Sequence, residues 1–173
     1  MSKYVFICSF FLLFINSCAE KERSHFPPAA LEEKVEGLAQ DTSYTIEEIL
    51  KQHQGQNVII EIWASWCADC IKAMPKVAKF QEENPEVKFI FISVDEESDK
   101  WKNGIHKYMK RFGVQGEHYH FTNGWDRSGD NAFINFIGLD WIPRYMLVGK
   151  DGQIIVYYAK SIEDKNISKN LSL

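Results

Sequence analysis

The chain of 173 residues is organised around one stretch, Trp63-Ala64-Ser65-Trp66-Cys67-Ala68-Asp69-Cys70. The residues before it, from Asn57 to Trp63, are apolar and rich in β-branched side chains, which predicts a buried strand. After it, apolar side chains recur at helical spacing as far as Glu83, which predicts a helix over residues 70–83. The two cysteines therefore stand where a strand gives way to a helix, and at this spacing they can close a small disulfide that opens readily.

The start of a helix favours a thiolate. The first turn leaves backbone N–H groups without partners, and the helix macrodipole places about half a positive charge there. In such a pair the first cysteine is the exposed one that attacks a disulfide, and the second resolves the mixed disulfide that forms. We assign these roles to Cys67 and Cys70, which makes the pair a candidate redox site.

Length and composition limit the classes of protein that the chain can belong to. With 173 residues and 45% hydrophobic side chains, it can bury one substantial core and is short for two. The net charge is −4, and no basic stripe is interleaved with aromatic residues, so we expect no nucleic-acid partner. No dimerisation segment precedes the expected domain, which favours a monomer.

The N-terminus has the pattern of an export sequence. Lys3 precedes an apolar run over residues 4–15, the length of the hydrophobic region of a signal peptide, so we predict a signal peptide over residues 1–17. Ile15-Asn16-Ser17-Cys18 resembles a bacterial lipobox, which predicts lipidation of Cys18. Cleavage near residue 19, or an anchor that is not cleaved, is the alternative.

Three segments follow from this interpretation. They are the signal peptide, a tether over residues 18–40, and a folded domain over residues 41–173. A lipid on Cys18 would hold the domain at a membrane far more firmly than charge could. We therefore expect a lipid-anchored protein of the bacterial cell envelope that faces the periplasm.

The rest of the chain alternates between helical and strand patterns. Together with residues 57–63 and the cysteine helix, a strand over residues 87–94 makes a βαβ unit with parallel pairing. An Asp-Gly pair in the turn 149–152 joins two alternating apolar strands, which predicts a hairpin. The other predicted elements are a helix over 45–50, a helix over 98–112, a short strand over 117–121, a helix over 130–137, the hairpin strands 144–148 and 153–158, and a terminal helix over 161–173.

The chain resembles the thioredoxin superfamily from about Asp41 to its end, and most closely the TlpA-like and ResA-like membrane-tethered thiol-disulfide oxidoreductases. The matching pieces are residues 61–70, Pro75, Ser93-Val94-Asp95 and residues 141–152. The resemblance implies an α/β thioredoxin fold, with a central mixed β-sheet flanked by helices and an insertion before the strand that follows the cis-proline. It also implies a thiol-disulfide oxidoreductase. We expect it to reduce disulfides in exported proteins, with protein substrates, an electron-donor thiol-disulfide protein and no cofactor.

The resemblance places further residues at the site. It implies that Pro143 is cis and lies opposite the disulfide, where the backbone before it pairs with the substrate chain. Many relatives have Thr before this proline, whereas this chain has Ile142, so its preferred partner can differ. Trp66 and Trp141 flank the cysteines and the proline in sequence, and we expect them to form an apolar rim that contacts the substrate.

Two acidic residues are expected to tune the chemistry. Glu61 falls where thioredoxins keep a buried acid, so we predict a raised pKa and a role as proton acceptor for Cys70. The alternative is a residue that points outward at the strand end. Asp69 opposes a thiolate at the helix start, and a less stable thiolate favours a reductant over an oxidant.

Other functions remain open from the sequence. A disulfide isomerase or oxidase would use the same cysteines. A peroxidase of the peroxiredoxin type would need Thr where Ala64 stands, and haem attachment would need His in place of Ile71. A metal site would have to join the cysteines to His118 and His120, which we interpret as a solvated strand face, so we expect no metal. A tethered domain that only binds a partner is the last alternative.

Overall fold

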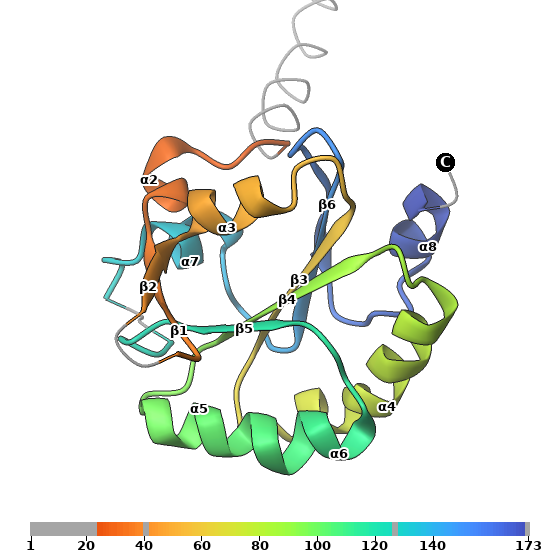
Figure 1. Cartoon of the computed structure of the whole chain (residues 1–173). Helices are drawn as coiled ribbons and strands as arrows, with labels where there is room; N and C mark the ends of the chain where they lie inside the picture. Colours follow the sequence, from red (N-terminus) through yellow and green to blue (C-terminus); the bar gives the residue numbers. More distant parts are fainter. Residues whose placement is uncertain (1–23, 40–41, 126–127, 172–173) are drawn as a thin grey trace, which may run out of the picture.

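Seven strands form one mixed sheet in the computed structural model, which describes residues 24–39, 42–125 and 128–171. The strands lie in the order β2-β1-β5-β4-β3-β6-β7 (Figure 1). The strands are β1 (Lys34–Gly37), β2 (Ser43–Thr45), β3 (Val58–Trp63), β4 (Lys88–Ser93), β5 (Glu117–His120), β6 (Arg144–Val148) and β7 (Ile154–Ala159).

The centre of the sheet is β3, whose six residues are all buried. It runs parallel to β4 and antiparallel to β6. A strand buried on both faces favours apolar side chains on both, which explains why the sequence of β3 does not alternate; Glu61 is its one acidic residue. The predicted βαβ unit is confirmed, and so is the α/β class with a central mixed sheet flanked by helices.

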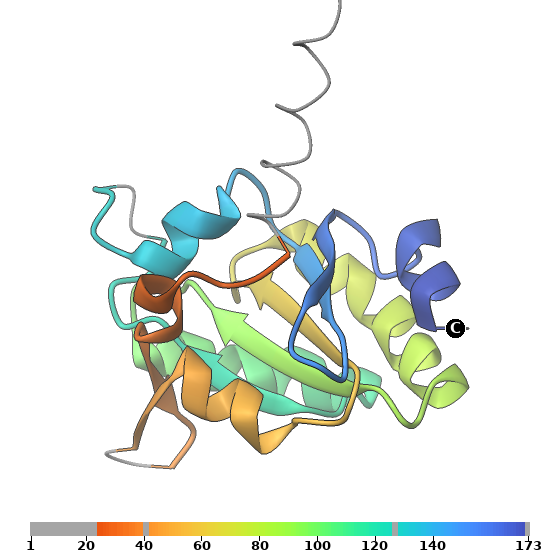
Figure 2. The same ribbon diagram turned by 90° about the horizontal axis from the view of Figure 1, so that it is seen from above.

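Helices cover both faces of the sheet. Figures 1 and 2 show α4, α5 and α6 on one side and α2, α3 and α7 on the other. The helices are α2 (Pro28–Leu31), α3 (Ile46–Gln52), α4 (Ala68–Glu83), α5 (Ser98–Gly104), the π-helical turn η1 (Ile105–Met109), α6 (Lys110–Phe112), α7 (Ala132–Ile137) and α8 (Lys165–Leu171).

The insertion predicted before the hairpin adds β5, parallel to β4, and the helical run from α5 to α6. The sequence predicts one helix over residues 98–112, and the structure shows the run passing through a π-helical turn at η1. Gly104 lets this run lie against the loop that carries the cysteines. A Cβ atom at Gly104 would come within 2.6 Å of the Ser65 Cβ, so a larger residue would push the two segments apart.

The segment before residue 41 corrects one prediction. Part of the tether predicted over residues 18–40 belongs to the fold, because α2 and β1 lie within it. Phe26 is buried and stacks on Phe133 with ring centroids 5.6 Å apart. Ala30 and Val35 are also buried, so residues 24–38 pack as part of the domain. These apolar residues are too few and too irregularly spaced to predict this packing from sequence.

The predicted signal peptide over residues 1–17 and Cys18 lie outside the described residues. Within the part of the chain that the structure describes, no helix is both long enough and apolar enough to cross a bilayer.

Candidate functional site

Cys67 and Cys70 form a disulfide where the loop after β3 leads into α4. Cys67 is the N-cap residue of α4, and its Sγ accepts a hydrogen bond from the Cys70 backbone N–H at 3.0 Å. That N–H is one of the donors that the first helical turn leaves without an intrahelical partner. The same donor and the helix macrodipole would stabilise a Cys67 thiolate in the reduced protein.

The two sulfurs differ in accessibility. Cys67 keeps 6% of its surface exposed, whereas Cys70 is fully buried. A partner can therefore reach only the first cysteine without opening the fold. This difference supports the predicted order, in which Cys67 attacks and Cys70 resolves.

The loop before β6 lies against the disulfide. The Ile142–Pro143 peptide bond is cis, as the resemblance implies. The carbonyl oxygen of Ile142 lies 3.6 Å from the Cys67 Sγ. Ile142 is buried, so its side chain contributes to the core near the sulfurs.

Glu61 lies within β3, next to Tyr145 of β6 in the antiparallel register. It is buried, which excludes the alternative of an outward-pointing residue at the strand end. Burial raises the pKa of Glu61 to about 8, and the nearby Tyr145 hydroxyl offsets this only in part. Among the described residues, the Glu61 Oε2 has no hydrogen-bond partner. Glu61 is therefore a carboxyl group that can hold or release a proton near neutral pH.

A second buried carboxylate anchors the loop that carries the cysteines. Asp95, just after β4, accepts hydrogen bonds from the Ser65 backbone N–H at 2.9 Å and the Ser65 hydroxyl at 2.7 Å. The Ser93 hydroxyl donates to the same carboxylate at 2.7 Å. Because Ser65 is two residues before Cys67, these bonds fix the backbone that delivers the attacking cysteine.

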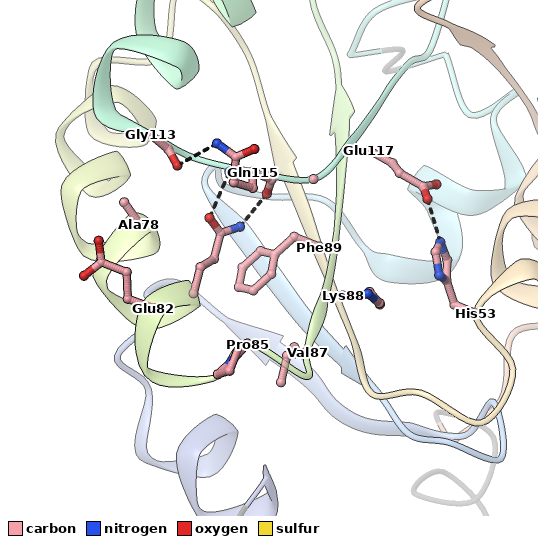
Figure 3. Close-up of a pocket in the computed structure, with 12 residues that line it drawn as sticks. His53, Ala78, Glu82, Pro85, Val87, Lys88, Phe89, Gly113, Gln115 and Glu117 are labelled. Atoms are coloured by element: carbon pink, nitrogen blue, oxygen red, sulfur yellow. Dashed lines mark hydrogen bonds and ion pairs between the residues drawn. The ribbon is translucent and has the colours of Figure 1, made fainter.

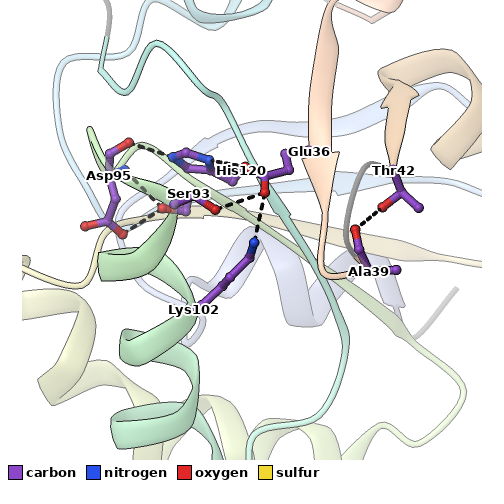
Figure 4. A network of polar contacts seen from close by, with 8 residues as sticks. Glu36, Ala39, Thr42, Ser93, Asp95, Lys102 and His120 are labelled. Atoms are coloured by element: carbon purple, nitrogen blue, oxygen red, sulfur yellow. Dashed lines mark hydrogen bonds and ion pairs between the residues drawn. The ribbon is translucent and has the colours of Figure 1, made fainter.

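The polar contacts of Asp95 continue from the end of β4 across the neighbouring strands β5 and β1 (Figure 4). One His120 ring nitrogen lies 2.8 Å from the Asp95 carbonyl oxygen and the other lies 3.2 Å from Glu36. Lys102 and Ser98 donate to the other carboxylate oxygen of Glu36, Oε1. Burial opposes the ionised form, but hydrogen bonds from Lys102, Ser98 and His120 hold the pKa of Glu36 below its usual value.

The position of His120 corrects the prediction of a solvated strand face. His120 is almost fully buried and stacks on Trp101 with ring centroids 5.1 Å apart. His118 is partly buried against Phe91, and burial lowers its pKa to about 4. The described residues contain no group of three or more His, Cys, Asp or Glu side chains that could hold a metal ion.

Three tryptophans lie on or against segments of the site: Trp66 precedes Cys67, Trp141 precedes the cis-proline segment, and Trp125 packs on Trp66. Trp66 and Trp141 are 56% and 46% exposed, which is unusual for large apolar side chains. Trp125, from the insertion, stacks on Trp66 with ring centroids 6.4 Å apart. Sequence reasoning missed Trp125, because nothing in its local pattern indicates that the insertion folds back to the active-site loop.

Another cavity lies elsewhere in the fold. It has a volume of about 480 Å³, and Gln81, Phe89 and Gln115 are among its lining residues (Figure 3). His53 pairs with Glu117 at its edge, at 3.1 Å. Lys88 and Glu117 begin β4 and β5, whereas the disulfide follows the opposite end of the parallel strand β3. This cavity is therefore remote from the redox pair.

Comparisons with known proteins agree with this geometry. Residues 55–154 match the model of a family described as Thioredoxin-like. The thiol-disulfide oxidoreductase ResA of Bacillus thuringiensis subsp. konkukian is 27% identical over 134 residues, which cover 72% of this chain and 70% of ResA.

Solved structures share the fold. A thiol-disulfide oxidoreductase from Bacteroides fragilis superposes with a TM-score of 0.60 at 16% identity, covering 81% of this chain and 94% of that one. A secreted disulfide oxidoreductase of Mycobacterium tuberculosis gives a TM-score of 0.58 at 15% identity, covering 85% of this chain and 100% of that one. At such low identity these likenesses establish the fold alone.

Proposed function

Because this chain belongs to the thioredoxin-like family and is a thiol-disulfide oxidoreductase, we propose that it reduces disulfides in exported proteins, with Cys67 as the attacking thiol. One observation carries the assignment of roles. The sulfur of Cys67 is the accessible one of the pair, and it accepts the Cys70 N–H at the start of α4.

Reduction proceeds in two exchange steps. The Cys67 thiolate attacks one sulfur of the substrate disulfide, forms a mixed disulfide and expels the other substrate sulfur as a thiolate that takes up a proton. The Cys70 thiol then loses its proton and attacks the Cys67 sulfur, which releases the second substrate thiol. Two electrons pass to the substrate, and the Cys67–Cys70 disulfide remains on the protein.

Glu61 is the proposed acceptor of the Cys70 proton. Cys70 is fully buried, so bulk water cannot take its proton directly. Glu61 is buried in the strand that leads to the cysteines, and burial places its pKa at about 8. A carboxylate with this pKa is a stronger base than an exposed one, which suits removal of a proton from a thiol.

Mixed-disulfide trapping tests the exchange steps. A Cys70→Ser variant keeps the attacking thiol and should accumulate covalent adducts with substrate proteins. A Cys67→Ser variant should form none and should lose turnover. Full reductase activity in either variant would refute the exchange mechanism.

The direction of electron flow rests on Asp69. Its side chain is 54% exposed and lies in the first turn of α4, where a negative charge opposes the Cys67 thiolate. We therefore propose a reductant that is supplied with electrons by another thiol-disulfide protein. Equilibration of the purified protein with glutathione buffers tests this. A potential below about −250 mV marks a reductant, and one above about −150 mV marks an oxidant or isomerase instead.

The proposed location is the bacterial cell envelope, with the domain held at a membrane by a lipid on Cys18 and facing the periplasm. The apolar run over residues 4–15 and the lipobox-like sequence before Cys18 support this. Growth of a bacterial expression host with a radiolabelled fatty acid tests it, because label should enter the wild-type protein and not a Cys18→Ala variant. Equal labelling of the two would exclude lipidation at this residue.

A further inference from the structure

A groove of about 290 Å³ opens beside the disulfide, between α4 and the segment around the cis-proline. Residues of α4 form one wall, Trp141 and Pro143 form another, and Lys160 follows the end of β7. The Ile142 carbonyl is 3.6 Å from the Cys67 Sγ, so the groove begins where a substrate cysteine must approach.

The α4 wall is a single helical face. Asp69, Lys72, Ala73 and Lys76 are spaced so that their side chains lie on the same side of the helix. From Asp69 to Lys76 this face extends for about 10 Å at 1.5 Å per residue, which matches about three residues of an extended peptide. The small side chain of Ala73 leaves room between the lysines.

The groove is positively charged. Three lysines and one acidic residue line it, although the chain as a whole carries a net charge of −4. Lys76 pairs with Glu163 at 2.5 Å, and Lys72 lies 3.4 Å from Asp69.

Lys160 differs from the other two lysines. Within the described parts of the chain it has no acidic partner. Instead, its Nζ lies over the rings of Trp141 and Tyr158, at 5.4 and 5.6 Å from their centroids. The aromatic rings hold the ammonium group in place without neutralising it. Among the described residues, Lys160 is therefore a cation without an acidic partner in the lining of the groove, which also includes Pro143.

From this geometry we propose that the groove selects substrate disulfides whose reacting cysteine has acidic residues two or three positions away. The carboxylates of the substrate would pair with Lys160 and Lys72 while its cysteine is bonded to Cys67. This names a substrate class for the proposed reductase, so it rests on the proposed function.

Symmetric peptide disulfides test the specificity. Each substrate is a disulfide-linked dimer of a single-cysteine peptide, so attack on either sulfur gives the same products. Three peptides differ only at the second and third positions on each side of the cysteine, which carry Glu, Gln or Lys. The purified full-length protein, reduced and kept in a mild detergent, reduces each peptide, and kcat/KM is measured.

The expected order of kcat/KM is Glu, then Gln, then Lys. Exposed ion pairs are individually weak, so the Glu and Lys peptides should differ by about three- to ten-fold at low ionic strength. The difference should shrink at 0.5 M salt, where charges on the surface are screened over a few ångströms. Equal rates for the Glu and Lys peptides at low salt would overturn the proposal.

A charge reversal locates the effect. Lys160→Glu should reduce the Glu-to-Lys ratio of kcat/KM to one or below. Lys110→Glu is the matched control, because it makes the same change of net charge on an exposed residue of α6 and should leave the ratio as in the wild type. If both variants change the ratio equally, overall charge and not the groove sets the preference. If the reduced protein reduces none of the three peptides, the proposed reductase function itself fails.

Discussion

Glu61 is a carboxyl group held inside the central strand, and its burial affects both catalysis and stability. For catalysis, Glu61→Gln should slow the attack of Cys70 on the mixed disulfide by about a hundred-fold, the lower end of the range for general-base catalysis. The first attack, by Cys67, should change little. Rapid-quench separation of the two steps measures this, and equal loss in both would mean that Glu61 is only structural.

For stability, the raised pKa of Glu61 predicts a specific pH dependence. In the unfolded chain the carboxyl ionises near pH 4.5, whereas in the folded protein it keeps its proton until about pH 8. Between these values the folded state binds more protons, so this group makes the free energy of unfolding fall as pH rises. The fall is several kcal/mol at most, since one pKa unit corresponds to about 1.36 kcal/mol.

Urea unfolding of the oxidised protein at pH 5 and pH 8 measures this contribution. Glu61→Gln cannot ionise, so its free energy of unfolding should exceed that of the wild type by more at pH 8 than at pH 5. Comparison of the two proteins at each pH cancels other titrating groups, such as His118 with its lowered pKa. A constant difference between the proteins would show that Glu61 is ionised in the folded state.

At the scale of elements, the end of β4 holds the loop between β3 and α4 through Asp95. Asp95→Asn replaces one acceptor oxygen by an NH₂ group that faces the Ser65 and Ser93 donors. We expect a loss of stability of about 2–4 kcal/mol, the range for breaking a buried charged hydrogen-bond network. We also expect a lower rate constant for attack by Cys67, because its loop is no longer fixed.

Glu97→Gln is the matched control for this prediction. Glu97 lies two residues further along, is exposed, and pairs only with Lys100 among the described residues. Its substitution should change stability by less than about 1 kcal/mol. Stopped-flow thiol exchange with a disulfide substrate measures the rate constant, and an unchanged rate in a folded Asp95→Asn variant would show that the anchor does not position Cys67.

The sequence predicts the features that have strong local patterns and misses those that depend on residues far apart in the chain. The cysteines, Pro143, the βαβ unit and the hairpin depend on contacts between neighbouring elements with strong local patterns, and the structure agrees with those predictions. The network from Glu36 to Ser65 could not be predicted, because it joins residues of β1, β4 and β5 up to 84 positions apart. Neither His120 nor Glu36 has a local pattern that reveals its burial.

At the scale of the whole molecule, the N-terminal segment is part of the folded domain. β1 pairs with both β2 and β5, and its Glu36 completes the network behind the active-site loop. A chain that starts at Ser24 should therefore keep the stability of the domain. A chain that starts at Thr42, next to the boundary indicated by sequence, should lose it.

The size of that loss follows from what the segment buries. Full burial of an apolar side chain such as Phe26 or Val35 contributes about 1.5–3 kcal/mol, and removal of β1 also exposes the edge of β5. We expect the chain that starts at Thr42 to unfold with a free energy lower by at least about 4 kcal/mol and to aggregate more readily. Urea unfolding followed by tryptophan fluorescence compares the two chains. Equal midpoints would mean that residues 24–39 pack on the domain without stabilising it, and that the network behind the active-site loop does not depend on β1.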